Sequence, residues 1–174
     1  MTWTSFHRRG EILRDVIASA NRRRDGHLPL ELTGVTETFG DELTLLAALQ
    51  LRWHTRLAGQ IERELLAEPM ELEDAVVAAW HATADELPGV RAILDRERTH
   101  PSTPAISEAL AKAAAKERLL LAMMAGRVST PDAAGARVGA EIEDRARATY
   151  VVAAPVHEEP PSGLLGRLKA VVAA

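Results

Sequence analysis

The sequence predicts an all-α protein, an antiparallel bundle of five to six helices followed by a flexible C-terminal tail. Hydrophobic residues make up 47% of the 174 positions but aromatic residues only 3%, so Leu, Ala, Val and Ile must build the core, and alanine is the strongest helix former. No stretch shows the sustained period-two alternation of a strand. Helix start and stop signals separate the apolar segments from one another.

The first helix is expected from about Ser5 to Arg24. Leu13, Val16 and Ile17 fall on one helical stripe, and Asp25-Gly26 supplies the stop. The segment 27–34 has alternating leucines and is expected to be a loop that covers helix ends.

The second and longest helix is expected from about Thr38 to Ala67, because Pro69 ends it. Its first half is apolar on more than one face, which is typical of a central helix. Its apolar seam advances in three- and four-residue steps through Leu43, Leu46, Gln50, Trp53, Leu57, Ile61 and Leu65.

A third helix carries Val76, Val77 and Trp80 on its inner face, and Pro88 breaks it. A shorter helix is then expected from Gly89 to about Thr99.

The tripeptide Ser-Thr-Pro occurs twice and predicts two further helix starts. Thr is a favoured N-cap, and Pro is favoured at the first helical position because the N–H it lacks has no partner there. The first copy, 102–104, begins a helix that Gly126 stops, and the second, 129–131, begins the last core helix, which ends near Tyr150. Residues 1–150 are therefore expected to form one helical domain.

The composition changes after residue 150. Residues 151–162 are Pro-rich and acidic and predict an extended linker. Residues 163–174 form a short amphipathic segment that we expect to be detached from the bundle and to dock on a partner; an ordinary frayed end is the alternative. The apolar face of this segment supplies the partner-binding candidates Leu164, Leu165, Leu168, Val171 and Val172.

Composition also restricts the compartment and the chemistry. The chain has no Cys, which excludes a disulfide framework and thiolate metal sites. No apolar run reaches the roughly 20 residues needed to cross a bilayer, and the N-terminus lacks the apolar core of a signal peptide. We therefore expect a cytoplasmic protein, and the preference for Arg over Lys indicates a GC-rich, bacterial genome.

The net charge of −4 argues against a nucleic-acid-binding domain. The first helix is nevertheless basic and would be the interface of a nucleic-acid-binding regulator, the least favoured alternative. The last helix offers Arg137, Arg145 and Arg147, but its acidic residues, Asp132, Glu141, Glu143 and Asp144, would face phosphates unfavourably.

A Trp-His pair occurs on each of two consecutive helices, as Trp53-His54 and Trp80-His81. Both Trp residues lie on the expected core face, so we predict that they are buried neighbours. The histidines lie at the edge of that face, where His54, His81 and Asp85 are the candidates for a metal or acid–base site. His54 has no carboxylate one turn away, and we predict that the two histidines do not bind a common metal.

A ferritin-like di-iron site needs two Glu-x-x-His motifs and two further inward glutamates. The chain has one such spacing, from Glu97 to His100, at an expected solvated helix end next to Pro101. Glu117, beside an apolar stripe, is the one other carboxylate expected to point inward. The chain therefore supplies only one of the two Glu-x-x-His motifs and one of the two further glutamates that such a site needs.

No nucleophile–base pair and no glycine-rich phosphate loop can be assembled, so the sequence predicts neither an enzyme nor a cofactor. The favoured hypothesis is a non-catalytic helical-bundle protein that acts through protein–protein interaction or self-association, for example as a homodimer. The main alternative is a metal- or small-molecule-binding bundle of the ferritin-like class with a site near His54 and His81.

Overall fold

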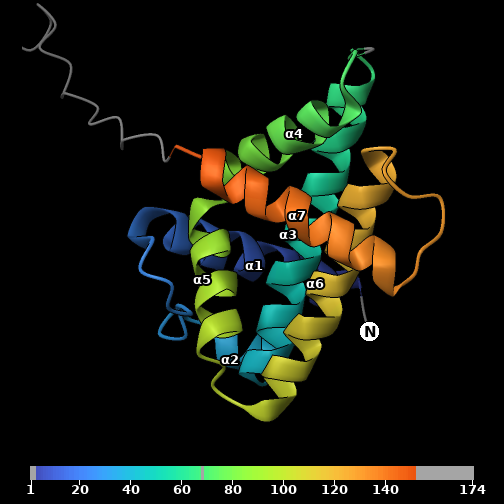
Figure 1. Ribbon diagram of the computed structural model, residues 1–174. Helices are drawn as coiled ribbons and strands as arrows, with labels where there is room; N and C mark the ends of the chain where they lie inside the picture. The colour runs from blue at the N-terminus through green and yellow to red at the C-terminus, as the bar shows by residue number, and fades with distance from the viewer. Residues whose placement is uncertain (1–2, 68, 152–174) are drawn as a thin grey trace, which may run out of the picture.

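The computed structural model describes residues 3–67 and 69–151, and within these ranges every regular element is a helix (Figure 1). The predicted all-α class is confirmed. The tail candidates from Leu164 to Val172 lie outside the described residues. The helices are α1 (Trp3–Arg23), α2 (Val35–Phe39), α3 (Glu42–Leu65), α4 (Leu72–Glu86), α5 (Pro88–Thr99), α6 (Pro104–Met124) and α7 (Ala133–Thr149).

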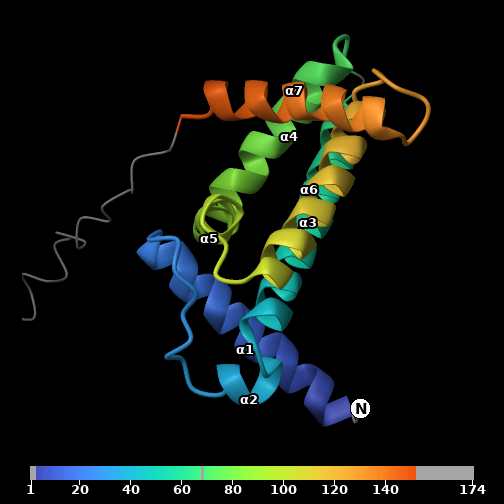
Figure 2. The same ribbon diagram turned by 60° about the horizontal axis from the view of Figure 1, so that its bottom comes forward.

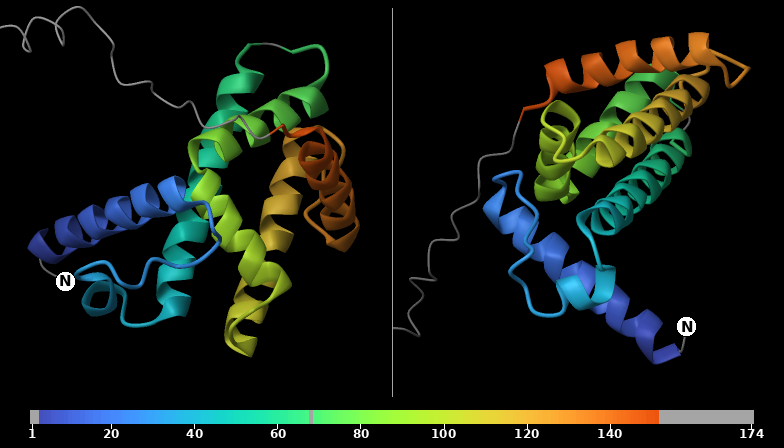
Figure 3. Two further views of the ribbon diagram at one scale, coloured as in Figure 1. Left: turned by 90° about the vertical axis from the view of Figure 1, so that its left-hand side faces the viewer. Right: turned by 90° about the horizontal axis from the view of Figure 1, so that it is seen from below.

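Helices α3 and α6 run side by side through the middle of the molecule (Figure 2). Helix α7 lies across one end of this pair, where it packs on α6 and α4, and α1 lies towards the other end, where it packs on α5 (Figures 2 and 3). The α3–α4 and α6–α7 pairs are the most extensive contacts. This arrangement buries one face of α3 and leaves part of its first half open.

The long helix expected from Thr38 is divided into α2 and α3. Helix α2 ends at Phe39, Gly40 follows it, and α3 begins at Glu42. The side chain of Asp41 accepts a hydrogen bond from the backbone N–H of Thr44 at 2.7 Å. This N-cap satisfies a donor that a helix start leaves unpaired, and it fixes the beginning of α3 four residues later than predicted.

The two Ser-Thr-Pro sequences behave differently. Thr103 caps α6 as predicted, since its Oγ1 accepts from the N–H of Ile106 at 3.2 Å. The second prediction is wrong: α7 begins at Ala133, and Asp132 is its N-cap, accepting from the N–H of Gly135 at 2.8 Å. Asp is a more favourable N-cap than Thr, and the second tripeptide, unlike the first, is followed directly by an Asp.

Asn21 on α1 holds the junction between α4 and α5. Its Nδ2 donates to the carbonyl oxygen of Glu86 at 3.1 Å, and its Oδ1 accepts from the N–H of Gly89 at 3.0 Å. These groups lie at the end of one helix and the beginning of the next, where backbone partners are missing. One amide side chain therefore supports both helix ends.

Two glycines allow close helix crossings. A Cβ on Gly89 would lie 2.0 Å from the backbone of Ala20 on α1, and a Cβ on Gly139 would lie 1.8 Å from the carbonyl oxygen of Arg118 on α6. Neither crossing has room for a side chain, so both helix pairs depend on glycine at these positions.

The predicted Trp pair is confirmed. Trp53 is 0% and Trp80 2% exposed, and their ring centroids are 5.8 Å apart in an edge-to-face arrangement. Aromatic pairs of this geometry add to the free energy gained by burial alone. Leucine, alanine, valine and isoleucine supply most of the remaining core, as the composition predicts.

Within the part of the chain that the structure describes, no helix combines the length and the apolar character that crossing a membrane requires.

Candidate functional site

Leu43, Ala47 and Leu51 form an apolar ridge along the open side of α3. The three residues are spaced four apart and therefore lie on one helical face. Leu51 is 64% exposed, which is unusual for a leucine in the middle of a long helix that packs on five other helices. We call these three residues the α3 ridge; an apolar groove runs along each of its sides.

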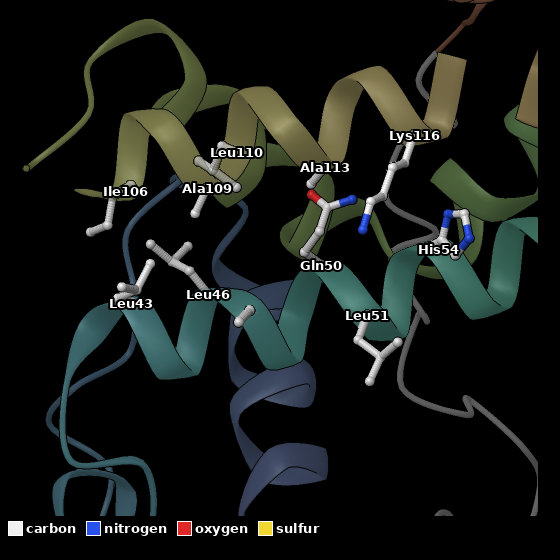
Figure 4. Close-up of a pocket in the computed structure, with 11 residues that line it drawn as sticks. Leu43, Leu46, Gln50, Leu51, His54, Ile106, Ala109, Leu110, Ala113 and Lys116 are labelled. Atoms are coloured by element: carbon white, nitrogen blue, oxygen red, sulfur yellow. The ribbon is translucent and has the colours of Figure 1, made fainter. Parts of the chain in front are cut away.

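The first groove lies between α3 and α6 and has a volume of about 370 Å³. Figure 4 shows Leu43, Leu46 and Gln50 of α3 pointing towards α6 across it. Lys116 reaches from α6 towards Gln50 at one end of the groove (Figure 4). The α6 wall consists of Ile106, Ala109, Leu110, Ala113 and Lys116.

The second groove lies between α1 and α3, on the other side of the ridge, and has a volume of about 590 Å³. Gly10 and Leu13 form its α1 wall, and Ala48 and the α3 ridge form the other. Small side chains on both walls allow an incoming chain to approach the backbone closely. Because the two grooves share the α3 ridge, they form one continuous apolar surface.

Cations surround this surface. Arg9 lines the α1–α3 groove and Lys116 the α3–α6 groove, while Arg14 and Arg52 line an adjoining hollow between α1 and α3. No Asp or Glu lines any of these three depressions. Among the described residues, none of these four cations forms an ion pair with a carboxylate. Arg9 donates to the carbonyl oxygen of Thr38 at 3.1 Å and lies over the ring of Phe39, but its charge, like that of the other three cations, is not neutralised by a carboxylate in these residues.

Gln50 gives the α3–α6 groove one unsatisfied polar group. The side chain is 8% exposed, and its Nε2 donates to Oε2 of Glu117 at 3.4 Å. Its Oε1 has no hydrogen-bond partner among the described residues. Buried acceptors are rarely left unpaired, and this one has almost no surface open to the groove.

The two candidate histidines have separate surroundings. His54 lines the α3–α6 groove, whereas Nε2 of His81 lies 2.8 Å from the carbonyl oxygen of Ala146 on α7. Asp85 accepts a hydrogen bond from the hydroxyl of Tyr150 at 2.9 Å. In residues 3–67 and 69–151 no group of three or more His, Asp and Glu side chains is placed to hold a metal ion. The structure does not bring these three candidates together into one site.

The Glu97–His100 pair does not form half of a metal site either. Oε2 of Glu97 accepts from the N–H and the hydroxyl of Ser102 at 3.1 Å each, and Glu97 is 8% exposed. It was expected at a solvated helix end; instead it closes the loop between α5 and α6. His100 is exposed and ends α5.

Glu117 points inward as predicted, but its neighbours are arginines. It is 0% exposed; its Oε2 accepts from Nη2 of Arg98 at 3.3 Å, and its Oε1 lies 3.7 Å from Nη1 of Arg91. A carboxylate between two guanidinium groups is neutralised by them, so it is not free to bind a metal ion.

Glu143 is a second buried carboxylate, and sequence reasoning placed it wrongly among the acidic groups that would face phosphates. It is 2% exposed and accepts from Arg98, Arg118 and Arg147 at 2.8–2.9 Å. Burial alone would raise the pKa of Glu143, but the hydrogen bonds from Arg147 and Arg118 and the charge of Arg98 lower it to about 2.

Asp95 completes this set of charges. It accepts from Arg91 at 2.7 Å and from Arg147 at 2.9 and 3.1 Å. The two guanidinium groups also lie over the Trp pair, Arg91 at 4.7 Å from the centroid of Trp53 and Arg147 at 5.4 Å from that of Trp80. We call the four arginines (91, 98, 118 and 147) and the three carboxylates (95, 117 and 143) the arginine network.

Comparison of the chain with protein-family models, with curated proteins and with solved structures gives no match.

Proposed function

We propose that this protein is a non-catalytic helical bundle that binds an acidic amphipathic helix of a partner protein on the α3 ridge. The observation that carries the proposal is the pair of apolar grooves, lined by cations and by no carboxylate. An amphipathic helix presents apolar side chains at three- and four-residue steps, and such a face fits a groove between helices.

Charge complementarity identifies the polar face of the partner helix. Arg9, Arg14, Arg52 and Lys116 stand beside the grooves without carboxylate partners among the described residues. Acidic side chains on both edges of a docked helix would pair with them, which accelerates association and selects against basic helices. The apolar surface between these cations favours such a helix over a nucleic acid, whose backbone offers phosphates but no apolar stripe.

The natural absence of cysteine makes a direct test simple. Ala113→Cys places a single thiol in the α3–α6 groove for attachment of an environment-sensitive fluorophore. Two synthetic amphipathic helices with the same leucine face are then titrated, one with glutamates and one with lysines on the polar face. We expect the acidic helix to bind at least about tenfold more tightly at low salt, and this preference to shrink as salt screens the charges.

Two matched variants locate the binding surface. Leu51→Glu puts a charge on the α3 ridge and should weaken binding about tenfold or more. Leu66→Glu makes the same change at a leucine that is 83% exposed and outside both grooves, and it should leave binding unchanged. Equal affinity for the two helices, or equal effects of the two variants, would contradict the proposal.

A second copy of the chain is the competing occupant. Light scattering over a range of protein concentrations measures the oligomeric state directly. A stable dimer that Leu51→Glu dissociates would show that the ridge serves self-association, and it would replace the acidic-helix proposal.

A further inference from the structure

A separate pocket lies between α4, α5 and the end of α7. Its volume is about 350 Å³, and its polar lining consists of Arg24, Arg91, Asp95, Arg147 and Tyr150, with Trp80 beside them. The remaining lining is apolar and small, from one proline and two alanines. The pocket shares no residue with the grooves described above.

The lining of this pocket has an excess of positive charge. Three guanidinium groups face one carboxylate, Asp95, and Arg91 and Arg147 already share that carboxylate. Arg24 has no ion pair with any described carboxylate, and its Nε donates to the carbonyl oxygen of Asn21 at 3.1 Å. The hydroxyl of Tyr150 donates to Asp85.

The interior behind the pocket supplies only part of the negative charge: Oε1 of Glu143 accepts from Arg147 at 2.8 Å, and Oε1 of Glu117 lies 3.7 Å from Nη1 of Arg91. The arginine network contains four guanidinium groups but three carboxylates, and Arg91 is 5% exposed. Nε and Nη1 of Arg91 have no hydrogen-bond partner among the described residues. Buried charge is costly unless it is paired. Arg91 and Arg147 both line the pocket, where a bound anion would add negative charge beside them.

The backbone at Arg24 is a further indication. Arg24 has φ 51°, a left-handed conformation that favours glycine and that side-chain-bearing residues adopt at a cost. Glycine is the usual residue directly after a helix end. Residues held in unfavourable backbone conformations are common at ligand sites, and here the arginine places a cation at the mouth of the pocket.

We propose that this pocket binds a small organic carboxylate. The planar guanidinium group matches the geometry of a carboxylate, and the proline and alanine side chains fit a compact apolar body attached to it. This binding does not depend on the acidic-helix interaction, because the two sites use different residues.

The test compares three probes on the full chain: benzoate, its neutral isostere benzamide, and inorganic phosphate. Binding is measured by calorimetry and by the NMR signal of the indole N–H of Trp80, a residue that lines the pocket. We expect benzoate to bind with one-to-one stoichiometry and to move this signal, and both other probes to bind about tenfold more weakly or less. Equal binding of benzamide would show that charge is not recognised, and equal binding of phosphate would show that the apolar body is not; either result overturns the proposal.

A matched pair of variants tests the role of Arg24. Arg24→Gln should weaken benzoate binding about tenfold, the usual effect of losing a hydrogen bond to a charged group. Arg22→Gln removes the same charge two residues away, from an exposed side chain that does not line the pocket, and should leave binding unchanged. Both positions are exposed, so thermal unfolding should show that both variants remain folded. Equal effects of the two variants, or no effect of Arg24→Gln, would overturn the assignment.

Discussion

Glu143 is the residue at which most of the buried charge converges. It accepts hydrogen bonds from three arginines, which come from α5, α6 and α7. A carboxylate that is 2% exposed is stable in the core only because these cations neutralise it. The three guanidinium groups in turn are stabilised by Glu143, because it is a partner that all three share.

Replacing this carboxylate should therefore be strongly destabilising. We expect Glu143→Gln to lower the free energy of unfolding by about 3–5 kcal/mol, because it removes one of the three anions that the buried guanidinium groups share. The matched control is Glu141→Gln on the exposed side of α7, which should change stability by about 0.5 kcal/mol or less. Denaturant unfolding measures both, and similar losses in the two variants would show that the network contributes little.

Sequence reasoning identified the buried Trp pair but missed the arginine network, and the reason is physical. Large aromatic side chains on an apolar helical face have one favourable place, the core. Charged residues on a helix ordinarily face solvent, so Glu143 and its exposed neighbours Glu141 and Asp144 look alike in the sequence. Burial of Glu143 depends on arginines contributed by other helices, and one sequence does not show which helices meet.

At the scale of the element, the sequence predicts a helix start correctly where only one N-cap residue is present. Thr103 began α6 as predicted. Where two cap residues lie close together, as Thr130 and Asp132 do, the proline after Thr130 indicated the wrong one, and Asp132, the stronger N-cap residue, begins the helix. Asp41 likewise divides what apolar periodicity alone predicts as one continuous helix. The grooves were not predictable, because they depend on the spacing between α1, α3 and α6.

The close crossing of α6 and α7 at Gly139 should make the stability of the protein sensitive to substitution there. A methyl group at residue 139 would lie 1.8 Å from the carbonyl oxygen of Arg118, so Gly139→Ala must separate the two helices. We expect a loss of about 1–3 kcal/mol or more in the free energy of unfolding, the range for overpacked sites.

Gly59 supplies the control. It lies inside α3, and a Cβ there would meet no atom within 4 Å. Gly59→Ala should raise stability by about 0.5–1 kcal/mol, because alanine restricts the unfolded chain and favours the helix. Opposite signs for the two substitutions, measured by thermal unfolding, are the expected result; a loss at both positions would indicate a general intolerance of alanine for glycine.

At the scale of the whole molecule, the two faces of α3 differ. One face buries Trp53 against Trp80 and Arg91, and the open face carries the α3 ridge. A binding surface built on a helix that the core holds rigidly needs little ordering when a partner docks, so less of the interaction free energy is lost. The arginine network contacts the proposed docking surface from the core side, through the hydrogen bond between Gln50 and Glu117.

The stability of the whole molecule should fall in acid because of this network. The pKa of Glu143 is lowered from 4.5 to about 2, and the neighbouring arginines also lower the pKa of Asp95 despite its burial. A carboxylate with a lowered pKa in the folded state binds protons more readily when unfolded, so its contribution is complete above the unfolded pKa and is lost as pH falls towards the folded pKa. We expect the free energy of unfolding to decline from about pH 5 to about pH 2, with a contribution on the order of 3 kcal/mol from Glu143. Denaturant unfolding across this range measures the slope, which should be shallower in Glu143→Gln and unchanged in Glu141→Gln. An equal slope in all three proteins would show that the acid sensitivity arises outside the arginine network.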